Sequence, residues 1–249
     1  MRSINLMIEI DDYVMKLNPE KTVLFFDIDN TLLRIKSDIG STEWVKWQDN
    51  MLRNCSDKCE YAASDTLHNF YMSIQKWLTI ANYETEPAEE YITELIDKYI
   101  SLGFKIILIT ARDKYAAGVT LQQLSQYYNI NQFYSSDLYF QNDSALHQNG
   151  VYFASGMNKG DCMEKLLAMI KLVFDYEPEN IIFIDDSMSE CNSVAQKFNN
   201  HKINATVFNY LYCSKYQFIF DQLDKNDLHN QWIDFVNIYE NTFKEDITS

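Results

Sequence analysis

The sequence TVLFFDIDNT, residues 22–31, decides the fold class, because a run of apolar residues passes directly into the acidic residues Asp27 and Asp29. The run is almost continuous rather than alternating, which is typical of a strand buried on both faces of a parallel sheet. Further short apolar runs, which we also predict as strands, are Phe104–Ile109, Ile181–Ile184 and Ala205–Phe208.

Helical patterns separate these runs. Apolar residues recur with helical spacing through Tyr91–Ile100 and through Leu166–Phe174, and the segment from Lys215 onward is also predicted as helix. Because strands that alternate with helices form βαβ units, the sequence predicts an α/β fold with a doubly wound, mostly parallel sheet. Two strand-like pieces, DLYF at 137–140 and GVYF at 150–153, predict a small hairpin.

The stretch of chain between Asp27 and Thr110 is much longer than one crossover helix requires. Helical patterns at Glu43–Asn54 and Asp65–Thr79 lie within it. We therefore predict a helical cap inserted at residues 35–83, and a core domain made of residues 1–34 and 84–249.

Composition excludes several classes of protein. Hydrophobic residues make up 47% of the 249, which is enough for a large core, and the formal net charge is −15. A surface this acidic repels nucleic acids and anionic membranes, so we predict no nucleic-acid partner. Phosphate chemistry is not excluded, because one bound cation reverses the local field.

Localisation is predicted to be cytoplasmic. No apolar run is long enough for a membrane span, and the N-terminal residues lack the features of a signal peptide. The odd number of cysteines shows no disulfide framework, and we interpret Cys55 and Cys59 as ordinary thiols rather than a zinc site.

Polar side chains follow the predicted strands at the edge where open α/β sheets bind ligands. They are Asp27, Asp29 and Thr31 after the first strand, Thr110 and Arg112 after the second, and Asp185 and Asp186 after the third, with Lys159 at the start of a predicted helix. Singly, each is more often a turn residue, a helix cap or a surface residue. Together, the carboxylates would repel one another unless a cation lay among them, and oxygen ligands favour Mg2+.

Arg112 has two interpretations at this stage. Its position next to Thr110 places it near the predicted site, where it could contact substrate. A surface salt bridge with its neighbour Asp113 is the alternative.

These motifs resemble the four-motif signature of the haloacid dehalogenase (HAD) superfamily. The signature is DIDNT after an apolar strand, a Thr that ends the next strand, a Lys, and a strand that ends in two Asp residues, and here it spans Asp27 to Asp186. The resemblance implies an HAD-like Rossmannoid core. Residues 26–48 also resemble an HAD subgroup of intracellular bacteria that includes candidate secreted effectors, so translocation into a host cell is the alternative localisation.

The resemblance also implies roles for the residues. Asp27 would be the nucleophile that forms an aspartyl-phosphate, and Asp29 the general acid and base. Thr110 and Lys159 would bind the phosphoryl oxygens. Mg2+ would be held by Asp27, Asp185 and the backbone carbonyl of Asp29. Residues with a supporting role would be Asp186, Thr31 and Asn30, and one of Ser189, Glu190 or Asn192.

The resulting prediction is a Mg2+-dependent phosphatase that acts on phosphate monoesters or phosphoproteins, with a further protein partner as an option. An Asp at position 29 favours ester hydrolysis over the other reactions of the superfamily. Aromatic residues of the predicted cap suit an aryl phosphate or phosphotyrosine, or else form the core of the cap; they are Trp44, Trp47, Phe70, Tyr71 and Trp77. A phospho-acceptor receiver module and a catalytically inactive HAD-fold binding module remain the alternatives.

Overall fold

The computed structural model describes residues 1–54, 60–81, 84–142 and 144–248. Cys55 and Cys59 lie outside these ranges. An eight-stranded sheet forms the centre of the molecule, in the order β1-β10-β9-β2-β5-β8-β7-β6. Its strands are β1 (Arg2–Ile4), β2 (Thr22–Phe26), β5 (Lys105–Thr110), β6 (Phe140–Gln141), β7 (Leu146–Gln148), β8 (Val151–Phe153), β9 (Asn180–Asp185) and β10 (Asn204–Tyr210).

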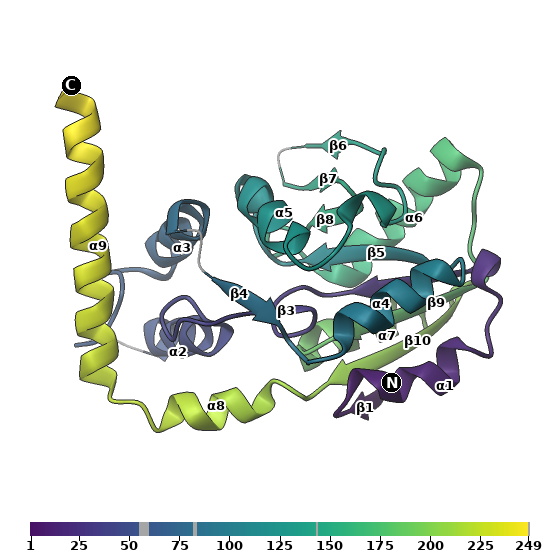
Figure 1. Cartoon of the computed structure of the whole chain (residues 1–249), viewed down its shortest axis with the longest axis horizontal. Coiled ribbons are helices and arrows are strands. Elements are labelled where there is room, and N and C mark those ends of the chain that lie inside the picture. The colour runs from purple at the N-terminus through teal and green to yellow at the C-terminus, as the bar shows by residue number, and fades with distance from the viewer. Residues whose placement is uncertain (55–59, 82–83, 143, 249) are drawn as a thin grey trace.

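Neighbouring strands from β1 to β8 in this order pair in parallel, whereas β7 pairs antiparallel with both β8 and β6 at one edge. The helices are α1 (Asp11–Val14), α2 (Thr42–Asn54), α3 (Leu67–Ala81), α4 (Ile92–Ser101), α5 (Ala117–Ser125), α6 (Lys159–Phe174), α7 (Met188–Phe198), α8 (Ser214–Asp221) and α9 (Lys225–Thr248). The predicted α/β class with a mostly parallel sheet is confirmed (Figure 1).

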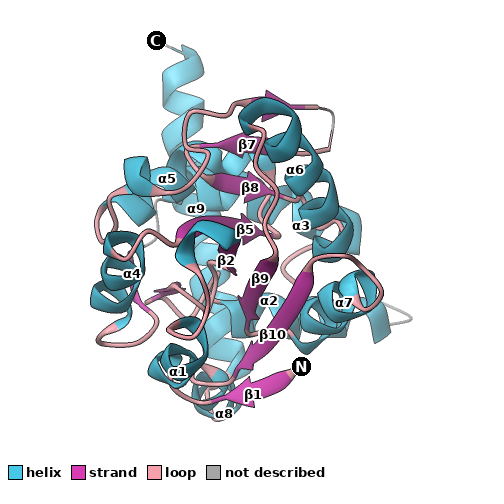
Figure 2. Ribbon diagram, turned by 90° about the vertical axis from the view of Figure 1, so that its right-hand side faces the viewer, coloured by secondary structure: helices cyan, strands magenta, loops and turns pink. Residues whose placement is uncertain are grey.

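Strand β2 shows why the apolar runs are continuous. Leu24 and Phe26 belong to one buried cluster, beside residues of α1, α4 and α5, whereas Val23 and Phe25 belong to a second, beside α6 and α7. Successive side chains of a strand point to opposite faces, so both faces of the sheet need apolar residues. Figure 2 shows the two helical layers on either side of the strands.

The prediction of a hairpin between DLYF and GVYF named the wrong partner strand. GVYF does form β8, but it pairs antiparallel with β7, and only Phe140 of DLYF enters the short strand β6. The turn lies at Asn149 and Gly150, whose φ angles are 51° and 73°. Asn-Gly is a strong signal for a two-residue hairpin turn, so the sequence did contain the correct register. A Cβ at Gly150 would lie 2.4 Å from the Cβ of Phe133, which leaves room only for glycine.

A second group of helices lies beside the sheet domain. A two-stranded ribbon of β3 (Leu33–Ile35) and β4 (Thr85–Pro87) leads out to α2 and α3, and α8 and α9 lie with them (Figure 1). Their shared apolar cluster consists of Ile39, Trp44, Phe70, Ile74, Phe220, Leu228 and Trp232. We call this group of helices the cap. The C-terminal helices thus contribute to it, while the domain boundary at residues 35–83 stays a prediction.

Trp232 connects the two chain segments of the cap. Its ring centroid lies 5.1 Å from that of Trp44, and its indole Nε1 donates to the carbonyl oxygen of Ala63 at 3.2 Å. Trp232→Ala is expected to lower the free energy of unfolding by about 3–5 kcal/mol, because a large buried side chain is replaced by a cavity. Chemical denaturation measures this. Ile233→Ala is the control, since Ile233 is the next residue and is exposed, and equal effects of the two substitutions would contradict the prediction.

No helix in the described ranges has both the length and the apolar character needed to cross a membrane.

Candidate active site

The acidic loop begins where β2 ends. The backbone N–H of Asp27 donates to the carbonyl of Ile184 at 2.9 Å, which attaches this residue to the neighbouring strand β9. Leu32 and Leu33 both donate to the carbonyl of Ile28, so the chain turns back at once. Asn30 takes a positive φ of 59° in this turn, a conformation that Asn tolerates better than most residues. The tight turn holds Asp27 and Asp29 at the carboxyl edge of the sheet.

Lys159 lies between two buried carboxylates. It is the first residue of α6, and its ammonium donates to Oδ1 of Asp27 and, at 2.7 Å, to Oδ2 of Asp185. The Lys159 side chain is 2% exposed, and both carboxylates are buried. The three predicted residues therefore meet at one point, as the motif order predicts.

Asp186 completes an acidic cluster. One carboxylate oxygen from each of Asp27, Asp185 and Asp186 lies within 4.8 Å of the others. All three donors are carboxylate oxygens, the type that a hard cation such as Mg2+ prefers, so the residues present fit that ion. The side chain of Asp29 is not in this cluster, and the expected contact of its backbone carbonyl with the metal stays a prediction.

Burial changes the protonation of the cluster. It raises the pKa of Asp27 from near 3.8 to about 7; Lys159 opposes this change, and Asp185 and Asp29 add to it. Burial also raises the pKa of Asp185 and of Asp186 to about 6. For Lys159, burial lowers the pKa, but Asp185 and Asp27 outweigh it and the net change is upward. The acidic cluster therefore holds protons at pH values where exposed carboxylates have lost them.

These pKa values predict how stability depends on pH. Without a divalent cation, the free energy of unfolding should fall as pH rises from about 4 to about 7, because the folded state holds protons that the unfolded chain has already released. Metal ions bind ionised carboxylates, so Mg2+ should raise the melting temperature little at about pH 5 and clearly at about pH 8. Thermal melts in Mg2+ and in EDTA at matched ionic strength measure this difference. An equal effect of Mg2+ at both pH values would contradict the prediction.

Arg112 pairs with Asp29. Its Nε and Nη2 atoms donate to the two Asp29 oxygens at 2.9 and 2.7 Å, and Nη1 donates to Thr120 and Gln123. The predicted alternative, a surface salt bridge with Asp113, is wrong: Arg112 is buried, and Asp113 caps the short helix Lys114–Ala116 instead. Arg112 meets Asp29 because β5 lies beside β2 in the sheet, so the end of β5 lies next to the loop that carries Asp29.

The two threonines lie within the same region and are both fully buried. The hydroxyl of Thr110 accepts the backbone N–H of Arg112 at 3.1 Å, at the end of β5. The hydroxyl of Thr31 has no hydrogen-bond partner among the described residues. The Thr110 hydroxyl is therefore held at the sheet edge by the hydrogen bond that its oxygen accepts from Arg112.

Of the three candidates after Asp186, Glu190 contacts the site. Its Oε2 accepts the backbone N–H of Lys159 at 3.0 Å and so joins the first turn of α7 to the start of α6. Ser187 caps α7 and donates its backbone N–H to Asp185 at 2.8 Å. An acidic residue three positions after a Ser cap is a capping pattern, which is the sequence signal that could have selected Glu190.

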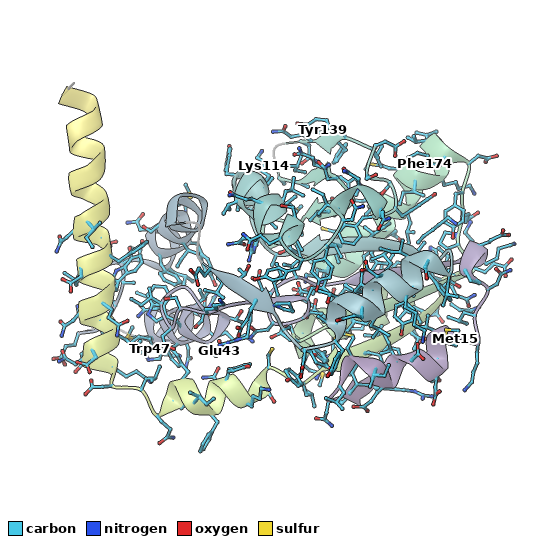
Figure 3. The ribbon with its side chains drawn as sticks, viewed as in Figure 1. Met15, Glu43, Trp47, Lys114, Tyr139 and Phe174 are labelled. Atoms are coloured by element: carbon cyan, nitrogen blue, oxygen red, sulfur yellow. The ribbon has the colours of Figure 1, made fainter. Side chains whose placement is uncertain are left out.

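Two cap residues at the site were missed by sequence reasoning. Glu43 and Lys46, both on α2, contact the core: Glu43 accepts from the Asn30 side chain at 2.8 Å, and Lys46 lies 3.2 Å from Asp186. Figure 3 labels Glu43 on this helix. The only signal in the sequence is their spacing of three residues, which puts them on one helix face.

A cavity of about 270 Å³ lies between the cap and the core, beside Asp29 and Arg112. Its lining otherwise consists of Ile35, Gly40, Thr42, Val45, Lys46, Tyr71, Ile74, Ala111, Asp113 and Ala116. Most of these side chains are small or apolar. The cavity therefore suits a compact, weakly polar group next to the Asp29 carboxylate.

Most of the predicted aromatic residues serve the core of the cap. Trp44 and Phe70 are fully buried with their rings 5.7 Å apart, and Trp47, which Figure 3 labels, packs against Phe220. Tyr71 lines the cavity and donates its hydroxyl to Asp49 at 2.6 Å. The side chain of Trp77 lies outside the described part of the chain.

Comparisons with solved structures include two that are similar in fold. One is a crystal structure of a presumed phosphatase from Clostridium difficile, with a TM-score of 0.44, 12% identity, and coverage of 80% of this chain and 98% of the other. The second is the HAD domain of the effector protein Lem4 from Legionella pneumophila, an inactive mutant, with a TM-score of 0.36, 11% identity, and coverage of 82% and 95%.

A search of curated protein sequences gives no match. One family model does match, over residues 3–245, which is almost the whole chain. This match includes the acidic loop, the sheet edge and the cap. The chain belongs to the family DUF2608, whose members are described as proteins of unknown function.

Proposed function

We propose that this protein is a Mg2+-dependent phosphatase that hydrolyses phosphate monoesters through an aspartyl-phosphate on Asp27. The observation that carries the proposal is the cluster of Asp27, Asp185 and Asp186, in which Asp27 and Asp185 are buried and both bind Lys159. Burying like charges together is costly, and a fold that has no use for them is expected to avoid it. The four HAD-like motifs add support, because each lies at the sheet edge where the resemblance requires it.

In this proposal Asp27 is the nucleophile. One of its carboxylate oxygens forms a bond to phosphorus while the bond from phosphorus to the ester oxygen breaks. Asp29 gives a proton to the departing oxygen and then takes one from the water that releases phosphate and regenerates Asp27. Thr110 and Lys159 donate hydrogen bonds to the phosphoryl oxygens.

Asp27, Asp185 and the backbone carbonyl of Asp29 would hold Mg2+, with Asp186 supporting them from the same cluster. When bound, Mg2+ would offset the negative charge of the phosphoryl group and of the carboxylates. Arg112 would orient Asp29 through its two parallel hydrogen bonds rather than contact substrate.

The proposed substrates are aryl phosphates, phosphotyrosine in proteins included. Support comes from the cavity beside Asp29, whose apolar lining suits a ring, and not from Trp44 or Phe70, which are buried in the cap. We propose the cytoplasm as the place of action; the resemblance of residues 26–48 to candidate effectors makes a host cytoplasm the alternative, which fractionation of infected cells would decide.

The test is a panel of phosphate esters assayed in Mg2+ and in EDTA. The panel contains p-nitrophenyl phosphate, phosphotyrosyl peptides, sugar phosphates and nucleotides. Turnover that needs Mg2+ and is fastest for the aryl esters supports the proposal. Faster hydrolysis of sugar phosphates removes the aryl preference. A stable phosphorylated Asp27 without turnover indicates a receiver module, and no reaction at all indicates an inactive binding module.

A further inference from the structure

We propose that Lys46, which the cap supplies from α2, is a substrate-binding residue that donates a hydrogen bond to a phosphoryl oxygen. This inference rests on the proposed phosphatase function. It goes beyond the four motifs, because Lys46 belongs to none of them and lies outside the sheet domain.

The position of Lys46 is set by its neighbour on the same helix face. Glu43, one turn earlier, is buried and accepts a hydrogen bond from the side chain of Asn30, inside the acidic loop. This contact fixes α2 against the loop. Residues three apart share a helix face, and Lys46 accordingly reaches Asp186 at the same edge of the sheet.

The ammonium of Lys46 lies at the boundary between two parts of the site. On one side it is 3.2 Å from Oδ2 of Asp186, a member of the acidic cluster. On the other side Lys46 lines the cavity that also contains Asp29 and Arg112. A phosphate ester with its leaving group in this cavity and its phosphorus near Asp27 would extend across this boundary, next to Lys46.

Lys46 has more hydrogen bonds to offer than Arg112, the other basic residue in the described lining of this cavity. Four of the five N–H groups of Arg112 are used by Asp29, Thr120 and Gln123. Lys46 has three N–H groups, and one described contact, to Asp186, uses one of them. Its side chain is 55% exposed, so the remaining donors face solvent or the cavity. A Lys ammonium binds phosphate well because it is a compact charge with several donors.

A purely structural role is the alternative. An exposed ion pair contributes little to stability, so the contact with Asp186 alone gives a weak reason for a lysine at this position. The two roles differ in what a substitution changes. Loss of a phosphate contact weakens phosphate binding, whereas loss of a surface ion pair does not.

The experiment compares the wild type with Lys46→Met, Lys46→Arg and the matched control Arg53→Met. Arg53 lies on the same helix, is exposed and pairs with the carboxylate of Asp49. With p-nitrophenyl phosphate and Mg2+, Lys46→Met should raise KM and the inhibition constant of inorganic phosphate about tenfold or more, the size expected for one charged hydrogen bond. Lys46→Arg should restore most of the loss, and Arg53→Met should change neither constant. All variants should keep the melting temperature of the wild type.

The outcomes separate this inference from the proposed function. If the wild type is active and Lys46→Met leaves KM and the inhibition constant of phosphate unchanged, only the role of Lys46 is overturned. Weaker phosphate binding that accompanies a lowered melting temperature overturns this role as well. If no ester is hydrolysed, the phosphatase proposal fails, and stabilisation by inorganic phosphate in Mg2+ becomes the readout. Phosphate that stabilises the wild type and Arg53→Met but not Lys46→Met then supports a phosphate site. Equal stabilisation of all variants, or none of any, overturns it.

Discussion

Asp27→Asn is expected to reduce phosphatase activity by about three orders of magnitude or more, because the amide cannot attack phosphorus. Asn has the same shape as Asp, and its side-chain oxygen can still accept from Lys159, so the fold should persist. The measurement is kcat/KM for p-nitrophenyl phosphate in saturating Mg2+, with a thermal melt to verify folding.

The control for this substitution is Asp97→Asn. Asp97 is exposed on α4 and does not line the cavity beside Asp29, so the same chemical change is made away from the site. Its activity should stay near that of the wild type. If Asp27→Asn retained comparable activity in a folded protein, the covalent route through Asp27 would be excluded.

Lys159→Met is expected to have the second large effect, on stability as well as on activity. The substitution leaves Asp27 and Asp185 buried without their cation, which typically costs about 3–5 kcal/mol when one partner of a buried ion pair is removed. The loss should be greatest near pH 8, where both carboxylates are ionised, and smaller near pH 5, where they take up protons. Chemical denaturation at the two pH values measures it.

Mg2+ gives this prediction a second readout. If the carboxylates form a cation site, Mg2+ should raise the melting temperature of Lys159→Met more than that of the wild type, because it replaces part of the missing charge. The matched control is Lys197→Met. Lys197 also bonds to two carboxylates, Asp161 and Glu164, but at the surface of the molecule, so its loss should shift the melting temperature little. Equal losses for the two lysines would show that burial at Lys159 is unimportant.

Sequence reasoning located the sheet and its acidic edge correctly for a local reason. A strand covered on both faces must carry apolar residues at successive positions, as Val23 to Phe26 do, and this pattern is visible without knowledge of the partner strands. Because the carboxyl ends of parallel strands share one edge, residues that follow different strands meet there. Asp27 follows β2 and Asp185 is the last residue of β9, its neighbour in the sheet, and Lys159 begins the helix before β9.

The pairing of each polar group depended on tertiary contacts. Arg112 could be assigned to Asp113 by proximity along the chain, but its side chain turns inward to Asp29, which is distant in sequence and adjacent in space. The roles of Glu43 and Lys46 depend on how α2 lies against the acidic loop, and a helix pattern states only which residues share a face. The C-terminal helices present the same limit: their apolar stripe requires a partner, but only the structure shows that Trp44 and Phe70 provide it.

Short-range patterns and strand direction were enough to identify which segments become buried strands and which carboxylates gather at their ends. Which cation meets which carboxylate, and which helices cover the edge, could be seen only in the three-dimensional structure. These ion pairs and helix contacts join residues that are far apart in the chain. They are stabilised by packing and burial, which a local sequence pattern does not show.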